Sequence, residues 1–203
     1  MDLICVPTLL SAKETRHIYK NILNTTCRKR HKIVISNLNA SAPTNRNWCL
    51  LQADIIKPRY VIMCDDDISG YYNGWADNLI KPFELYKNCV MVSASLVNKD
   101  GSAAIMMNHK RDFGLEYQVV NDALPSACVA FKHDPELRFD ERYTIENKGS
   151  GYEDADMCMQ LNRKHNGIYV INNKVKLIHN NHKCNQENIQ YFGSLFRQKW
   201  FVK

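Results

Sequence analysis

The stretch YVIMCDDD, residues 60–67, decides the expected fold. Its first five residues are an uninterrupted apolar run that leads directly into three carboxylates, Asp65, Asp66 and Asp67. Short apolar runs of this kind are typical of strands buried on both faces, as in the parallel sheets of α/β proteins. Ligands of open α/β sheets bind at the carboxyl ends of the strands, so the triplet lies where a site is expected.

The segments on either side of this stretch alternate between strand-like and helix-like patterns. Ser11 and Glu14 form a Ser-x-x-Glu capping box, which starts a helix. The expected strands are 3–6, 32–36, 60–64, 90–93, 103–107, 127–131, 168–171 and 176–179, and the expected helices are 11–23, 46–55, 73–86, 153–164 and 185–200. This order predicts an α/β fold with a mostly parallel central sheet flanked by helices.

Composition and charge narrow the class of protein. The chain has 203 residues, of which 45% are hydrophobic and 24% are charged, values typical of one globular domain. We find no apolar run long enough to cross a bilayer and no signal-peptide pattern at the start, so we expect a cytoplasmic protein. The net charge of +6 suits an anionic partner but is modest for a dedicated nucleic-acid-binding protein.

The eight cysteines predict neither a disulfide framework nor a zinc ribbon. No Cys-x-x-Cys pair occurs, and Cys5, Cys64, Cys89 and Cys128 each lie inside an apolar run. A thiol in such a run behaves as a small hydrophobic side chain. We therefore expect the cysteines to be reduced and structural.

The triplet itself favours a metal site. Three adjacent carboxylates repel one another, and folding them at a strand end is costly without a cation or strong hydrogen-bond donors. Their hard oxygen ligands suit Mg²⁺ or Mn²⁺, and such an ion can bridge two phosphates of a nucleotide. The alternative is an acidic turn in which the aspartates cap the residues that follow.

A second acidic group, Glu153 and Asp154, follows the turn formed by Gly149, Ser150 and Gly151. Glycines let the backbone approach a ligand closely, and a carboxylate at this place can act as a general base. The alternative is structural, because acidic residues in the first turn of a helix interact favourably with its dipole.

Two histidines, His179 and His182, follow the last expected strand. Either could complete a metal shell with an imidazole nitrogen. A histidine at the end of a strand commonly has a structural role instead. The two histidines favour a metal site only when they are considered together with the acidic triplet.

In this order, the motifs resemble those of the family 2 glycosyltransferases and their relatives with the GT-A fold. The matching segments are the opening strand that ends at Pro7 and Thr8, the second strand that ends at Asn37, the Arg46-Asn47 pair, the D-x-D motif of Asp65 and Asp67, the segment 139–143, the Glu153-Asp154-Ala155-Asp156 helix start and His179. The family usually has Asp where Asn37 stands and Gly where Cys49 stands.

The resemblance implies a single Rossmann-like nucleotide-binding domain of the GT-A type over residues 1–203. Residues 1–94 would form the half that binds the nucleotide sugar, and residues 95–203 the acceptor-binding and catalytic half. Pro7, Thr8, Asn37, Arg46, Asn47, Asp65 and Asp66 are implied in donor binding, Asp65, Asp67, His179 and His182 in binding Mn²⁺ or Mg²⁺, and Asp154 or Glu153 in catalysis.

The implied reaction moves a sugar from a nucleoside-diphosphate sugar to an acceptor hydroxyl, with inversion at the anomeric carbon. A glycan or a lipid-linked sugar is the expected acceptor, and a hydroxymethylated base in DNA is an alternative. The DNA alternative would suit the basic residues Lys110, Arg111, Arg163, Lys164, Arg197 and Lys199. Two further alternatives come from other classes: a metal-dependent nucleotide phosphohydrolase, and a non-catalytic module that binds a nucleotide sugar or a glycan. The sequence predicts no oligomeric state.

Overall fold

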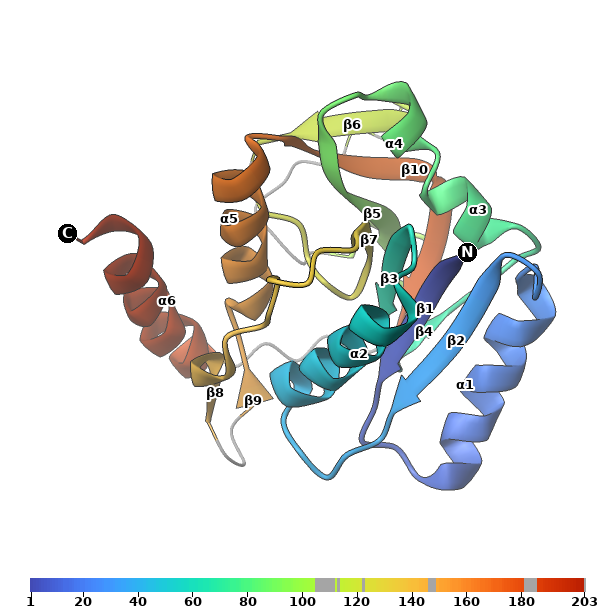
Figure 1. Cartoon of the computed structure of the whole chain (residues 1–203), viewed down its shortest axis with the longest axis horizontal. Helices are drawn as coiled ribbons and strands as arrows, with labels where there is room; N and C mark the ends of the chain where they lie inside the picture. Colours follow the sequence, from blue (N-terminus) through green and yellow to red (C-terminus); the bar gives the residue numbers. More distant parts are fainter. Residues whose placement is uncertain (105–111, 113, 122, 146–148, 181–185, 203) are drawn as a thin grey trace.

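The computed structural model describes the whole chain apart from residues 105–111, 113, 122, 146–148, 181–185 and 203 (Figure 1). The elements in chain order are β1 (Asp2–Pro7), α1 (Ala12–Thr25), β2 (His31–Ser36), α2 (Ala42–Ile56), β3 (Tyr60–Cys64), β4 (Ile68–Ser69), α3 (Trp75–Leu79), α4 (Pro82–Leu85), β5 (Cys89–Val97), β6 (Tyr117–Val120), β7 (Cys128–Lys132), the 3₁₀ turn η1 (Glu141–Tyr143), β8 (Thr144–Ile145), β9 (Gly149–Ser150), α5 (Glu153–His165), β10 (Ile168–His179) and α6 (Gln186–Phe201). The predicted α/β class is confirmed.

The main sheet has eight strands among the described residues, in the order β2-β1-β3-β7-β5-β10-β4, with β6 paired along β10. Strands β1, β2 and β3 pair in parallel, and β10 pairs in parallel with β5. Strand β7 lies between β3 and β5 and runs antiparallel to both, so β5 and β10 point the same way as β1. Strands β1, β2, β3, β5 and β10 therefore share one direction, and the mostly parallel sheet predicted from the sequence is confirmed.

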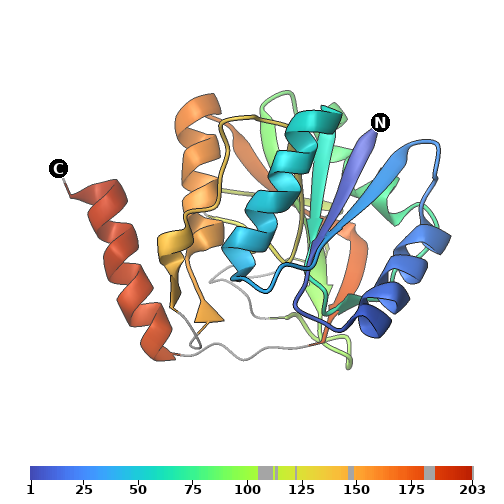
Figure 2. The ribbon, with the colours of Figure 1, turned by 60° about the horizontal axis from the view of Figure 1, so that its bottom comes forward.

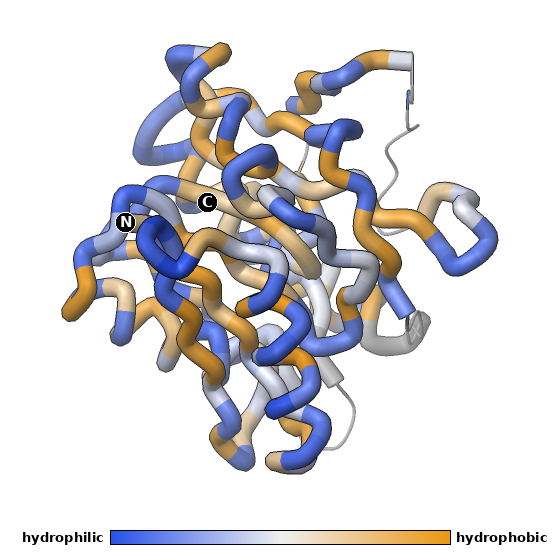
Figure 3. The backbone as a smooth tube through the Cα atoms, turned by 90° about the vertical axis from the view of Figure 1, so that its right-hand side faces the viewer, coloured by the Kyte–Doolittle hydropathy of each residue, from blue (hydrophilic) through white to orange (hydrophobic). Residues whose placement is uncertain are grey.

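The sheet separates two hydrophobic cores, because successive residues of a strand point to opposite faces. Ile62 and Cys64 of β3 face the core closed by α1 and α3, and Val61 and Met63 face the core closed by α2 and α5. The helices cover both faces of the sheet in two views (Figures 1 and 2). Hydrophobic residues recur along these helices between hydrophilic ones, as amphipathic packing on a sheet requires (Figure 3).

Helices α1 and α2 each begin directly after a serine whose side chain caps the helix. The predicted capping box of α1 is present, with reciprocal hydrogen bonds between Ser11 and Glu14. Helix α2 starts earlier than predicted, since Ser41 caps it and Pro43 stands in its first turn. Proline suits this position because it has no N–H to leave unpaired, so the predicted start at residue 46 was wrong.

Four other expected elements need correction. The helix predicted over 73–86 is two short helices, α3 and α4, because Gly74 is left-handed at the start and Pro82 cannot continue the ladder. The strands predicted over 168–171 and 176–179 form the single strand β10, with a register shift between Asn172 and Lys176. Ala103 forms only an isolated bridge with Val97, and residues 105–107 lie outside the described residues.

Six of the cysteines in the described segments are buried free thiols, as expected, and Cys27 is exposed. In the part of the chain that the structure describes, no helix is both long and apolar enough to cross a membrane. Strands β4, β6, β8 and β9 had no counterpart in the sequence prediction, since each has only two to four residues.

Candidate functional site

The strand ends bring the candidate residues to one edge of the sheet. Strands β1, β3 and β10 point the same way, so Thr8, the triplet and His179 all lie at their carboxyl ends. The ladder between β3 and β7 extends one step further, since the N–H of Asp65 donates to the carbonyl of Ala127 (2.7 Å). This bond fixes the backbone at the point where the apolar strand meets the carboxylates.

The three carboxylates of the triplet point toward three different partners. Asp65 Oδ1 accepts a hydrogen bond from Arg46 (2.8 Å), and Asp66 Oδ2 accepts one from the Thr8 hydroxyl (2.6 Å). Asp67 Oδ1 lies 3.1 Å from Nε2 of His179. Separate partners reduce the mutual repulsion of adjacent charges, which the sequence alone could not show.

Asp65, Asp67 and His179 could hold a metal ion, since one ligand atom of each lies within 4.8 Å of the others. Oδ1 of Asp67 is buried and accepts no hydrogen bond of suitable geometry, although Nε2 of His179 lies 3.1 Å away, as expected for two atoms that face one cation. Two atoms that each lie about 2.1 Å from one octahedral ion are roughly 3 Å apart, close to the separation of Asp67 and His179. The donor set of two carboxylates and one imidazole fits Mn²⁺ or Mg²⁺.

Asn180 holds Asp67 in place from the end of β10. Its backbone N–H and its side-chain amide both donate to the carbonyl of Asp67, at 3.0 and 2.7 Å, and the amide also reaches the Ser69 hydroxyl. We missed this residue in the sequence, although its place beside His179 was a usable signal. The other predicted ligand, His182, lies outside the described residues.

Arg46 links the triplet to the second acidic group. Its guanidinium is 6% exposed and donates to Asp65 at 2.8 Å and to Glu153 at 2.9 Å. Burial alone would lower the pKa of Arg46, but the two carboxylates raise it above its ordinary value. The guanidinium also lies over the Phe139 ring, 5.4 Å from its centroid. The two predicted acidic groups therefore form one site.

Asp154 differs from its neighbour Glu153, which is paired with Arg46. Burial, followed by the charge of Glu153, raises the pKa of Asp154 to about 7. Backbone N–H groups of Ala155 and Ser126 oppose that rise by donating to the carboxylate, and the Ala155 bond measures 2.8 Å. A half-buried carboxylate with this pKa exchanges a proton near neutral pH. Ser126 was not predicted as part of the site.

Three of the remaining donor-binding candidates, Pro7, Asn37 and Asp66, lie at the strand ends. Pro7 ends β1 and is buried, and Asn37 lies beside it, donating to the carbonyl of Leu10 (3.1 Å). Burial and the two neighbouring aspartates raise the pKa of Asp66, while Thr8 opposes that rise.

Asn47 points away from the triplet. Its amide exchanges hydrogen bonds with the backbone of Phe139 at 2.8 and 2.9 Å. Its role in donor binding stays a prediction. A different asparagine, Asn45, orders the loop after β2 through Ser36 and Leu38, and the sequence reading missed it.

A groove of about 810 Å³ runs along α1 and reaches Asp66 at one end. Lys13, Arg16, His17 and Lys20 line it, at the spacing that places residues on one face of a helix. Lys13, Arg16 and Lys20 form no ion pair with any described carboxylate. Lys13, Arg16 and Lys20 outnumber the two acidic lining residues, Glu14 and Asp66, so the groove carries a small excess of positive charge next to the triplet.

No protein-family model and no curated protein matches this chain. Several solved structures are similar to it in fold. The structure of S. aureus TarS 1-349 matches with a TM-score of 0.60 and 12% identity, over 100% of this chain and 75% of that one. The same protein in complex with UDP-GlcNAc matches with a TM-score of 0.58 and 13% identity, over 91% of this chain and 59% of that one. GalNAc-T7 with UDP, GalNAc and Mn²⁺ matches with a TM-score of 0.57 and 10% identity, over 90% of this chain and 44% of that one.

These similarities establish the fold as GT-A type. At 10–13% identity, they establish the fold alone. The chain spans less than two thirds of two of these three structures.

Proposed function

We propose that this chain is a metal-dependent, inverting glycosyltransferase that transfers a sugar from a nucleoside-diphosphate sugar to an acceptor hydroxyl. One observation carries the proposal: Arg46 joins the Asp65, Asp67 and His179 cluster to the Glu153-Asp154 turn at the strand ends of a GT-A fold. The cluster would bind a diphosphate through a metal ion, and the turn would place a general base beside it. UDP-GlcNAc in TarS and UDP with Mn²⁺ in GalNAc-T7 support the choice of donor and metal.

On the donor side, Asp65, Asp67 and His179 would hold Mn²⁺ or Mg²⁺, which neutralises charge on a diphosphate leaving group. Arg46 fixes Asp65 and adds positive charge beside the ligand set. Thr8 and Asp66, together with Pro7 and Asn37 nearby, would contact the nucleoside, because they lie at the carboxyl ends of β1, β2 and β3.

On the acceptor side, Asp154 would accept the proton of the attacking hydroxyl. Its pKa of about 7 lets it hold and release that proton near neutral pH. Glu153 is the less suitable base because one of its oxygens is engaged by Arg46. A positioned base of this kind typically contributes about 10²–10⁴-fold in rate.

A glycan or a lipid-linked sugar is the proposed acceptor. The basic groove along α1 favours, as a second candidate, a hydroxymethylated base in DNA, since unpaired cations beside the site suit a phosphate backbone. Binding of duplex DNA that weakens steeply with salt would support this second candidate. Absence of binding at low salt would dismiss it.

Calorimetry of nucleotide binding tests the donor side. We expect UDP to bind in the presence of Mn²⁺, and Asp67→Ala to abolish the metal-dependent part, because the variant removes one of the three ligands. The exposed turn residue Asp100 provides a matched control, and Asp100→Ala should bind normally. Binding that is indifferent to a chelator in the unaltered chain would refute the metal site.

Turnover of the donor tests the acceptor side. Asp154→Asn should lose sugar transfer while keeping its affinity for the nucleotide, since the variant removes the base and leaves the metal ligands in place. Release of UMP and sugar 1-phosphate without any acceptor would point to the phosphohydrolase alternative, because that reaction breaks the phosphoanhydride bond and leaves the glycosyl bond intact. Unchanged transfer in the variant would exclude Asp154 as the base.

A further inference from the structure

The turn that carries Glu153 and Asp154 has no cap of its own. The residue before α5, Tyr152, has a left-handed φ of 69° and offers no side-chain hydrogen bond to the helix. Helix starts are normally stabilised by Ser, Thr, Asp or Asn at this place, and positive φ is unfavourable for residues other than glycine. The geometry of this turn must therefore be held by other parts of the chain.

One face of α6 packs against the first residues of this turn, Gly151 and Tyr152. Phe192 is fully buried, and a Cβ on Gly151 would lie 3.3 Å from its ring. The rings of Tyr152 and Phe196 are 5.4 Å apart. Gly193 provides room for the Tyr152 hydroxyl, which would lie 3.1 Å from a Cβ at that position. The fit leaves little space for the turn to move toward α6.

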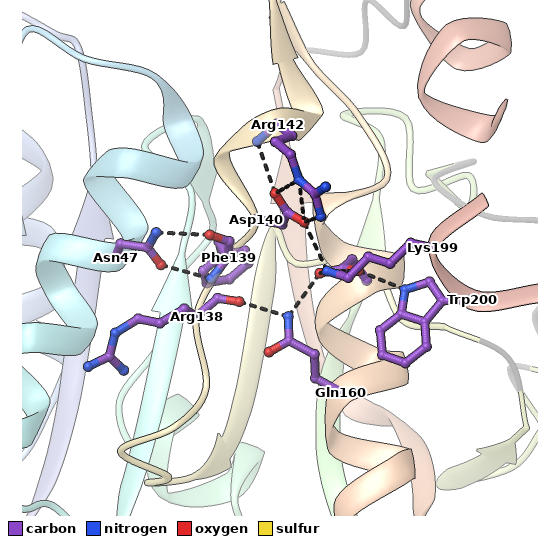
Figure 4. Close-up of polar contacts among 9 residues, drawn as sticks. Asn47, Arg138, Phe139, Asp140, Arg142, Gln160, Lys199 and Trp200 are labelled. Carbon is purple, nitrogen blue, oxygen red and sulfur yellow. Dashed lines mark hydrogen bonds and ion pairs between the residues drawn. The ribbon is translucent and has the colours of Figure 1, made fainter. Parts of the chain in front are cut away.

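Lys199 and Trp200, in the last turn of α6 (Figure 4), contact the other end of the same turn at Asp156. Asp156 is fully buried and accepts hydrogen bonds from Trp200 Nε1 (2.7 Å) and Gln160 Nε2 (2.8 Å). Lys199 Nζ lies 2.7 Å from one oxygen of Asp156 and 2.9 Å from the other. A buried carboxylate needs partners of this kind, and α6 supplies the cation and the indole N–H among those that hold Asp156.

Lys199 also ties this contact to the segment before η1. Its Nζ lies 2.9 Å from Oδ2 of Asp140, which is held in turn by Arg142. One cation is thus shared by two carboxylates from different parts of the chain. The arrangement fixes the start of α5 relative to the irregular segment that carries Phe139, over which Arg46 lies.

We propose that α6 is a clamp that positions the turn 151–156, with Lys199 and Trp200 as positioning residues that act on Asp154 through Asp156. The two contacts of α6 fall at 151–152 and at 156, and the proposed base lies between them. Release of either contact would let the turn relax from its left-handed start and move Asp154 relative to an acceptor. The role of the clamp in catalysis rests on the proposed function, whereas its hold on the turn does not.

Hydrogen–deuterium exchange tests the hold on the turn without any substrate. Lys199→Met removes the cation, and Trp200→Phe removes the N–H donor but keeps a ring. In both variants we expect the amides of 153–157 to exchange at least about tenfold faster, while those of β1 and β3 stay protected. Gln198→Ala, at an exposed position of the same helix, is the matched control and should exchange normally. Unchanged protection of 153–157 would overturn the proposal, and so would a uniform loss of protection in β1 and β3.

A kinetic comparison tests whether the hold serves catalysis. With UDP-GlcNAc and Mn²⁺ as the probe, Lys199→Met should lower kcat for UDP release about tenfold and leave the donor KM unchanged, since the clamp touches no donor-binding residue. Lys199→Arg should restore kcat because it retains the cation. Normal kcat together with faster exchange at 153–157 would overturn the positioning role. If the unaltered chain turns over no nucleotide sugar, the proposed function fails and the exchange experiment still decides the clamp.

Discussion

Glu153 and Asp154 are neighbours in the chain, yet their environments differ. Glu153 faces Arg46, and Asp154 is half-buried beside it, with backbone N–H groups as its partners. Pairs of carboxylates with different environments are a common way to divide acid–base roles in a site. The sequence left the choice of base open between the two residues, and the contacts favour Asp154.

The raised pKa of Asp154 predicts how the rate depends on pH. A general base works in its deprotonated form, so the rate of transfer should rise with pH and level off above about 7. The profile of kcat/KM for the unaltered chain, measured from pH 5 to 9, checks this expectation. The same profile in Asp154→Asn should lose the step near 7, and a step that persists in the variant would assign it to another group.

At the scale of the element, β10 shows why polar residues inside a strand are hard to interpret from sequence. Asn172, Asn173 and Lys174 interrupt the apolar pattern, and we expected two strands on either side of them. In the fold, the Asn172 amide donates to the carbonyl of Asn78, and the Asn173 amide donates to the carbonyls of Asp112 and Leu115. These partners are distant in sequence, so only the packed structure shows that the N–H groups of both amides find acceptors inside one strand.

The connection between α5 and β10 depends on a glycine. A Cβ on Gly167 would overlap Cγ1 of Val90 and would lie 2.6 Å from the carbonyl oxygen of Asn88, which already accepts the N–H of Ile168. Gly167→Ala should therefore lower the free energy of unfolding by about 1–3 kcal/mol, because the backbone must shift. Urea denaturation measures the change.

Gly114→Ala is the matched control for that variant. Among the described residues, a Cβ on Gly114 would have one neighbour within 4 Å, the end of the Asp112 side chain at 3.2 Å, which can move aside, so this substitution should change stability little. Equal stability of the two variants would contradict the close packing at Gly167.

At the scale of the whole molecule, the site is assembled from the ends of strands that the sheet brings together. Thr8, Asp65 and His179 are far apart in sequence and lie at one edge because β1, β3 and β10 share a direction. A ligand that bridges them binds only the folded chain. Its binding energy therefore adds to the stability of the entire fold.

Thermal unfolding with nucleotide and metal measures this linkage. UDP with Mn²⁺ at 100 times its dissociation constant should stabilise the chain by about 2.7 kcal/mol, or roughly 5–10 °C in melting temperature for a domain of this size. Uridine lacks the diphosphate, so its effect should not depend on Mn²⁺. The same stabilisation by UDP in the presence of a chelator would contradict a metal-bridged diphosphate.

The sequence by itself determined the local features of this protein. Three local patterns were sufficient to predict the α/β class and the acidic site at a strand end: the apolar run before the triplet, the capping box of α1, and the order of strands and helices. Each of these patterns depends only on residues that are neighbours in the sequence. The partners of the carboxylates depend on the tertiary structure. Three contacts join residues that are far apart in the sequence: Arg46 binds Asp65 and Glu153, Asn180 binds Asp67, and α6 binds Asp156. Only the packing of the sheet and the helices fixes these contacts. The triplet showed where a cation could bind, and the fold decided which side chains surround it.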